Sequence, residues 1–126
     1  MTEHMRPDER LEYSPIIDRP KLKLPDGGRM IIWTIVNVEV WDSTKPQPRM
    51  TITPAGGGSP IPDVPNWAWH EYGNRIGFWR LMKVLNEFEV PTTLALNGGV
   101  CKTYPRIAEE ALKSDWELMG HGYSQL

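Results

Sequence analysis

Residues 30–41 read MIIWTIVNVEVW, and this stretch decides the fold class. It is almost continuously apolar and rich in β-branched and aromatic side chains, which is typical of a strand buried on both faces of a parallel sheet. Glu39 interrupts the apolar run. Because burying an unpaired carboxylate is costly, the sequence predicts that Glu39 either forms a salt bridge with an arginine or serves a chemical purpose.

Two helices and two more strands are expected further along the chain. Apolar residues recur on one side of residues 74–89, which predicts an amphipathic helix that buries one face. Residues 92–97 and 116–119 predict short strands, and residues 105–114 predict a helix that begins with Pro105. The order β-loop-α-β-α-β implies parallel strands joined by right-handed crossovers, and therefore an α/β sheet or a barrel.

Stretches rich in proline or glycine flank the first expected strand. Residues 1–29 contain four prolines and both charges but no apolar signal-peptide segment, so we interpret them as an irregular N-terminal leader. The domain is then expected to span residues 30–126. Within it, residues 42–66 predict a long loop, and loops of this length are usually functional or disordered.

The bulk composition restricts the partners and the compartment. The chain has 126 residues and a net charge of −2, with no basic stripe, so neither nucleic acid nor a membrane is an expected partner. No run approaches the roughly 18–20 apolar residues of a membrane-spanning helix. The single cysteine, Cys101, excludes an intramolecular disulfide and is expected to be a small buried side chain. These features predict a soluble, cytoplasmic protein.

Polar side chains follow each of the three expected strands. Asn37, Glu39 and Asp42 lie near the end of the first strand, Asn97 ends the second, and His121 follows the third between two glycines. Because functional residues gather at the carboxyl ends of parallel strands, we expect a carboxylate, an amide and an imidazole to share one rim, where Asn97 would contact a substrate. The alternative is that strand ends turn polar only because they leave the core, as for Asn97 in a turn.

An aromatic cluster precedes the first expected helix. Trp67, Trp69 and Tyr72 surround His70 just after the long loop. These side chains are candidates for binding a substrate, with the aromatic rings stacking on a ring of that molecule. Simple packing of the loop against the core explains the same residues, since aromatic side chains are common in cores and in loops.

Three ordered blocks resemble a known family. They are WELMGHGYSQ at residues 116–125, GFWRLMKVLNEFEVPTTLALNG at residues 77–98 and PDVPNWAWHEYGNR at residues 62–75. Together they resemble the polysaccharide deacetylase (NodB-homology) family, in the branch of allantoinase-like and peptidoglycan deacetylase-like proteins. The resemblance covers residues 30–126, which correspond to the N-terminal portion of that domain.

The resemblance implies a fold and an activity. The fold is a distorted (β/α) barrel, of which this chain carries an incomplete version with about three β/α units. The activity is hydrolysis of a carbon–nitrogen bond other than a peptide bond. The substrate is an N-acetyl sugar in carbohydrate metabolism or a cyclic amide such as allantoin.

The resemblance also implies a site. Family members hold a divalent metal, commonly zinc, with one aspartate and two histidines beside a carboxylate base. In this chain Glu39 is the acidic residue that remains in the first motif, and Gln125 replaces the second histidine. Glu39 and His121 are therefore the implied metal ligands, with zinc bound weakly or not at all. They are equally the implied catalytic pair, with Glu39 as base and His121 as electrophile or acid.

Other readings of the same residues stay open. Three β/α units do not close a barrel of about 200 residues or more, and the chain stops inside the second motif. It could therefore be a truncated, non-catalytic fragment or pseudo-enzyme, a homo-oligomer, or one part of a barrel that a second chain completes. A third reading is a carbohydrate-binding module that uses Trp67, Trp69 and Tyr72.

Overall fold

The computed structural model describes residues 10–53, 56 and 61–125. The chain divides into two units, Met1–Ile32 and Trp33–Leu126. The described part of the first unit is irregular apart from a 3-10 turn at Pro25–Gly27, in which Asp26 has a positive φ of 54°. Most of its apolar side chains, including those of Met30 and Ile32, are exposed.

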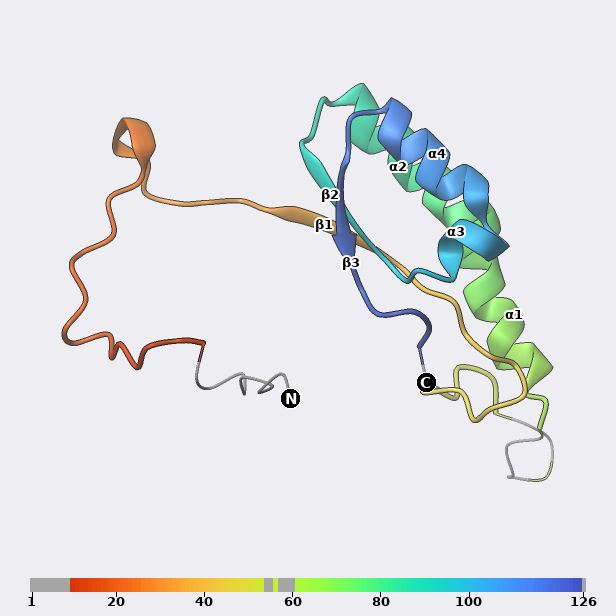
Figure 1. Ribbon diagram of the computed structural model, residues 1–126. Coiled ribbons are helices and arrows are strands. Elements are labelled where there is room, and N and C mark those ends of the chain that lie inside the picture. The colour runs from red at the N-terminus through yellow and green to blue at the C-terminus, as the bar shows by residue number, and fades with distance from the viewer. Residues whose placement is uncertain (1–9, 54–55, 57–60, 126) are drawn as a thin grey trace, which may run out of the picture. The chain divides into compact units, whose positions relative to one another are not determined.

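The second unit contains a three-stranded parallel sheet (Figure 1). The strands are β1 (Thr34–Val38), β2 (Thr92–Leu96) and β3 (Glu117–Gly120), in the spatial order β1-β2-β3. The predicted parallel α/β arrangement is confirmed at this level. Within the described residues β1 and β3 form the two edges of the sheet, and the barrel implied by the resemblance stays a prediction.

Two helical segments connect the strands. The first runs without interruption through α1 (Val64–Tyr72), a π-helical turn at Gly73–Gly77 and α2 (Phe78–Glu87). The second consists of the short helix α3 (Val100–Thr103) and α4 (Pro105–Lys113).

The first helix begins ten residues earlier than its apolar periodicity predicted. The carboxylate of Asp63 caps it by accepting a hydrogen bond from the backbone N–H of Asn66 at 3.3 Å. Pro65 fits the first turn because the N–H that proline lacks has no partner there. The prolines that suggested a loop are therefore compatible with a helix start.

The helices cover one face of the sheet (Figure 1). Val36 and Val38 of β1 point into the core on this face, together with Leu94 and Leu96 of β2. The buried apolar side chains are Val36, Val38, Phe78, Met82, Leu94, Ala95, Leu96, Val100, Ile107, Ala111 and Trp116. This core fixes the strand ends relative to one another.

Two expectations about burial were wrong. The first strand is buried on one face only, because Ile35 and Asn37 are exposed on the side opposite the helices, where no second layer covers the sheet among the described residues. The strand also starts at Thr34 rather than Met30. Cys101 is exposed on α3 instead of buried, since this short helix lies at the surface.

Candidate functional site

The three strand ends bring Glu39, Asn97 and His121 into one row. Val38, Leu96 and Gly120 are aligned in the sheet register, and the three polar residues follow them directly. Side chains alternate along a strand, and Val38 and Leu96 point into the core. Glu39 and His121 therefore belong to the open face, opposite the helices, whereas Asn97 on the middle strand is fully buried.

Glu39 and His121 meet on this open face. Oε1 of Glu39 lies 3.2 Å from Nε2 of His121, although the two residues are 82 positions apart in the chain. At this distance the ring N–H donates a hydrogen bond to the carboxylate. The side chains retain 27% and 36% exposure respectively, so both groups can still be reached from solvent. The structure therefore places the two predicted catalytic residues together.

Asn97 joins the other two strand ends from within. Its side chain is fully buried, and its Oδ1 accepts a hydrogen bond from the backbone N–H of Val40 at 3.0 Å. Its Nδ2 donates a short hydrogen bond to the carbonyl oxygen of His121. In this structure Asn97 positions the backbone next to Glu39 and at His121, whereas the sequence had predicted contact with a substrate.

The loop after β3 crosses closely over the end of β2. The N–H groups of Gly98 and Gly99 donate hydrogen bonds to the carbonyl oxygens of Gly122 and Tyr123, at 2.8 and 2.9 Å. A Cβ atom on Gly99 would lie 3.0 Å from the carbonyl oxygen of Tyr123, which is too close without a shift of the backbone. The pair of glycines is thus what lets this loop hold His121 in place.

Gln125 ends the same loop. Its backbone N–H donates a hydrogen bond to the carbonyl oxygen of Val40 at 3.0 Å, and Gln125 pairs with Trp41 in an isolated parallel bridge. The predicted zinc site needs three protein ligands in its catalytic form. In the part of the chain that the structure describes, no three histidine, cysteine, aspartate or glutamate side chains converge. The donors that do meet, Glu39 and His121, do not fit such a site.

Among the described residues, neither Asp42 nor Asn37 forms a hydrogen bond with Glu39 or His121. The carboxylate of Asp42 is exposed and accepts hydrogen bonds from the hydroxyl and the backbone N–H of Thr44, at 2.6 and 2.9 Å. These bonds, the one from the hydroxyl first, hold the pKa of Asp42 below its ordinary value. Asp42 is therefore a turn residue, while Asn37 is exposed on β1.

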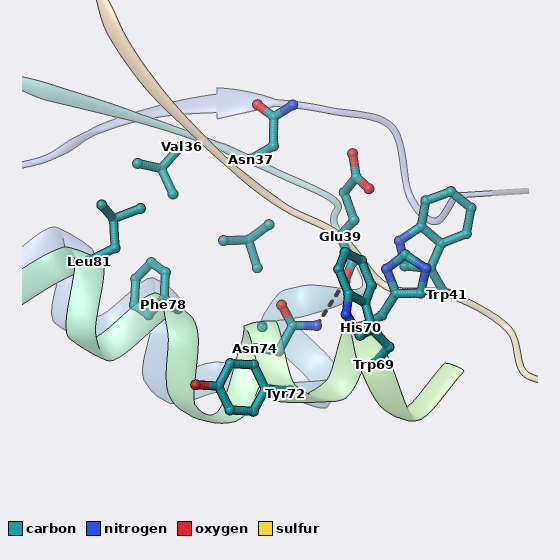
Figure 2. A pocket seen from close by; sticks show the side chains of 12 residues that line it. Val36, Asn37, Glu39, Trp41, Trp69, His70, Tyr72, Asn74, Phe78 and Leu81 are labelled. Atoms are coloured by element: carbon teal, nitrogen blue, oxygen red, sulfur yellow. Dashed lines mark hydrogen bonds between the residues drawn. The ribbon is translucent and has the colours of Figure 1, made fainter. Parts of the chain in front are cut away.

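A pocket of about 440 Å³ lies between β1 and the helix α1–α2 (Figure 2). At one end Trp41, Trp69 and His70 surround the backbone next to Glu39, and at the other end Val36 and Leu81 form an aliphatic wall. Its lining residues are Val36, Asn37, Val38, Glu39, Trp41, Trp69, His70, Tyr72, Gly73, Asn74, Phe78 and Leu81. Trp69 and His70 were predicted at such a site, but Trp67 does not line it.

His70 is held by aromatic contacts. Its ring stacks on Trp41 with centroids 5.0 Å apart, and Trp69 meets it edge-on at 5.4 Å. Burial lowers the pKa of His70, Glu39 opposes that effect, and Arg49 adds to it. The charge of Glu39 is therefore felt at His70.

Sequence reasoning missed Trp41 and Asn74. The amide of Asn74 donates to the carbonyl oxygen of Glu39 at 3.0 Å, and Asn74 lies in the π-helical turn. Trp41 was treated only as the end of an apolar strand. The apolar periodicity does not predict a π-helical turn. A contact between residues 35 positions apart cannot be predicted from a single sequence.

A second carboxylate, Glu71, is buried nearby in α1. Its Oε1 accepts a very short hydrogen bond from the hydroxyl of Tyr104, and its Oε2 lies 2.7 Å from Nε of Arg75. Burial first, and then Glu71, raises the pKa of Tyr104 to about 12. Both carboxylate oxygens of Glu71 have partners, and the bond to Tyr104 connects α1 to the start of α4.

Comparison with known proteins gives no match: no protein family, no curated protein and no solved structure is significantly similar to the chain. Among the described residues, no helix has the length and apolar character needed to cross a membrane.

Proposed function

We propose that this chain carries an amide-hydrolysis site at the carboxyl ends of its strands, for carbon–nitrogen bonds other than peptide bonds. The observation that carries the proposal is the 3.2 Å contact between Glu39 and His121 on the open face. A carboxylate hydrogen-bonded to an imidazole and reachable by solvent is a common base and acid pair. The resemblance to polysaccharide deacetylases and allantoinase-like proteins supplies the reaction class.

The two groups divide the proton transfers of hydrolysis. The oxygen of a water molecule attacks the amide carbonyl carbon while Glu39 takes one of the water's protons. The carbon–nitrogen bond breaks as His121, in its imidazolium form, donates a proton to the departing nitrogen and becomes neutral. The products are a carboxylic acid and an amine. The proton on Glu39 returns to His121 across their hydrogen bond, which restores the starting state.

Asn97 and the glycine-supported loop keep this pair in place. Asn97 holds the backbones of Val40 and His121, and Gly98 and Gly99 hold the loop that follows His121. A fixed separation matters because general acid–base catalysis requires hydrogen-bond reach of the substrate. The proposed steps do not use zinc, because a catalytic zinc site needs three protein ligands and Glu39 and His121 supply two.

The substrate proposed is an N-acetyl sugar or a cyclic amide such as allantoin. Trp41, Trp69 and His70 line the pocket on the helix side of the Glu39 backbone and offer aromatic surface for a ring. We extend the proposal to the fold: the parallel β/α units are the N-terminal portion of a polysaccharide deacetylase-like barrel in a cytoplasmic protein. The order of the three sequence blocks and the parallel order β1-β2-β3 support this extension.

The test is an assay of the purified chain on N-acetylglucosamine oligomers and on allantoin, with and without zinc. We expect amine or ring-opened product, and a drop of about 100- to 10,000-fold for Glu39→Gln. Glu71→Gln is the matched control, since it also removes one carboxylate and should keep turnover per folded molecule. Equal turnover of Glu39→Gln and the wild-type chain would contradict the proposal.

A second candidate is sugar binding without hydrolysis by a non-catalytic fragment or pseudo-enzyme. It is favoured by Trp69 and Tyr72, which line the pocket and are each about half exposed. Calorimetric titration with chitin oligomers measures this directly. Binding that Trp69→Ala abolishes and Trp67→Ala retains, with no product formed, would establish this candidate instead of the first.

A further inference from the structure

The outer edge of β1 carries backbone groups that could pair with another strand. Val38 and Val40 direct backbone groups toward β2, as the bonds from Asn97 to the Val38 carbonyl and from Val40 to the Asn97 side chain show. Because backbone groups alternate in direction along a strand, those of Ile35 and Asn37 face the outer edge. Among the described residues no backbone group bonds to them from that side.

An apolar stripe on α2 continues this edge. Leu81, Val84 and Phe88 follow one another at three- and four-residue spacing, so they lie along one side of the helix, and they are 45%, 49% and 71% exposed. The neighbouring side of α2, with Phe78 and Met82, faces the core. These exposed residues are therefore left over after the core is filled.

The stripe lies on the flank of α2 away from α4. Asn86 marks the flank toward α4, because its amide donates to the hydroxyl of Ser114 at 3.0 Å. On the opposite flank, Leu81 lines the pocket beside β1 together with Val36 (Figure 2). The strand edge and the stripe thus form one lateral surface, defined by Ile35 and Asn37 of β1 and by the α2 stripe.

We propose that this lateral surface is a two-fold interface between two copies of the chain. The occupant must offer a strand beside the β1 edge and an apolar helix beside the α2 stripe. A second copy, rotated about an axis perpendicular to the sheet, offers both, with β1 antiparallel to β1 and α2 antiparallel to α2. Such an interface is isologous, since the same surface serves both partners.

The charges next to the stripe fit this arrangement. Arg80 and Glu87 are seven residues apart, so they lie on the same flank of α2, beside the stripe. In an antiparallel helix pair, equivalent flanks face each other. Arg80 of one copy then faces Glu87 of the other, twice per dimer. Nη1 of Arg80 donates to the hydroxyl of Tyr72 at 3.0 Å, which leaves the remaining guanidinium N–H groups for this pairing.

The dimer changes only one end of the pocket. The second copy covers the aliphatic end at Val36 and Leu81, while the aromatic end at Trp41 and His70 stays at the strand ends. The inference therefore rests on no step of the proposed hydrolysis. It is an alternative to barrel closure at this edge, since the outer edge of β1 pairs either with a second copy or with a later barrel strand. Association and turnover are measured separately, and either can fail without the other.

Sedimentation equilibrium of the full chain tests the interface. We expect a species with twice the 14.4 kDa mass of one chain, and a dissociation constant raised about tenfold or more by Val84→Glu. A chain that stays monomeric at about 100 μM, where any micromolar dimer is largely assembled, would overturn the proposal. A dimer that Val84→Glu leaves unchanged would overturn it too.

Charge reversal provides a sharper control. Arg80→Glu and Glu87→Arg should each weaken the dimer, because each single change places like charges opposite one another. The double variant Arg80→Glu/Glu87→Arg restores opposite charges and should recover most of the affinity. Lys83→Glu lies on the solvent side of α2 and is the matched control. Failure of the double variant to recover affinity, with helix content unchanged by circular dichroism, contradicts the proposed pairing.

Discussion

Glu39 and Glu71 are two carboxylates that differ in burial and in the number of their partners. Glu71 is 7% exposed and has both oxygens occupied, by Tyr104 and by Arg75. Glu39 keeps 27% side-chain exposure and meets one partner, His121, at 3.2 Å. A carboxylate with every oxygen committed to neighbouring protein groups stabilises the fold. A carboxylate with a spare oxygen at a strand end can still bind or take a proton.

The largest expected effect on stability comes from Asn97, whose buried amide holds the backbones of Val40 and His121. Asn97→Ala leaves the Val40 N–H and the His121 carbonyl without their buried partner. We expect the free energy of unfolding to fall by about 2–4 kcal/mol, at about 1–2 kcal/mol for each unpaired group. Urea denaturation measures it. Ser124→Ala, in the exposed part of the same loop, is the control and should change little. A loss below that of the control would show that Asn97 does not hold the strand ends.

The next effect contrasts the two carboxylates directly. Glu71→Gln should lower the free energy of unfolding by about 1–3 kcal/mol, because one hydrogen-bond partner of the buried pair is weakened. Glu39→Gln should change it by less than about 0.5 kcal/mol, as is usual for a partly exposed side chain. Urea titrations of both variants side by side provide the measurement. Equal losses would remove the distinction between a structural and a functional carboxylate.

A third effect appears at alkaline pH. The folded chain raises the pKa of Tyr104 to about 12 from an ordinary value near 10. Between these values the unfolded chain loses this proton while the folded chain keeps it. The resulting contribution to stability is present below pH 10 and lost as pH rises toward 12. Tyr104→Phe should show a shallower fall over this range in thermal melts, and Tyr123→Phe should match the wild type.

The smallest effect concerns His70. Its pKa is below the ordinary 6.5, first because of burial, while Glu39 works in the opposite direction. Neutral His70 is favoured in the fold, so stability falls as pH drops below 6.5. Glu39→Gln should lower the pKa of His70 further in an NMR titration, whereas Glu71→Gln should leave it unchanged. A His70 pKa that ignores Glu39 would show that the two groups are not coupled.

Much of the arrangement was predictable from local patterns. The order of strands and helices along the chain predicted the strands at residues 92–96 and 117–120 and their parallel pairing. The rule that parallel strands end at the same edge then predicted that Glu39 meets His121. The register then decides which residues share a row. Barrel closure, zinc and the substrate remain predictions.

The features that were missed depend on contacts across the chain. The start of α1 at Val64 was hidden by prolines that read as loop signals. The exposed face of β1 was misread, because an apolar run cannot reveal whether a second layer is present. Trp41 and Asn74 join the site only through distant neighbours. Asn97 was expected to contact a substrate, whereas in the structure its amide is hydrogen-bonded to the backbones of Val40 and His121.

The separation between Glu39 and His121 also has a consequence in time. Glu39 leaves the ribosome 82 residues ahead of its partner, which at 5–20 residues per second amounts to roughly 4 to 16 seconds. During that interval β1 and the Glu39 carboxylate can exist without the loop that later holds them. The contact between Glu39 and His121 can therefore form only after both helical connections have been synthesised.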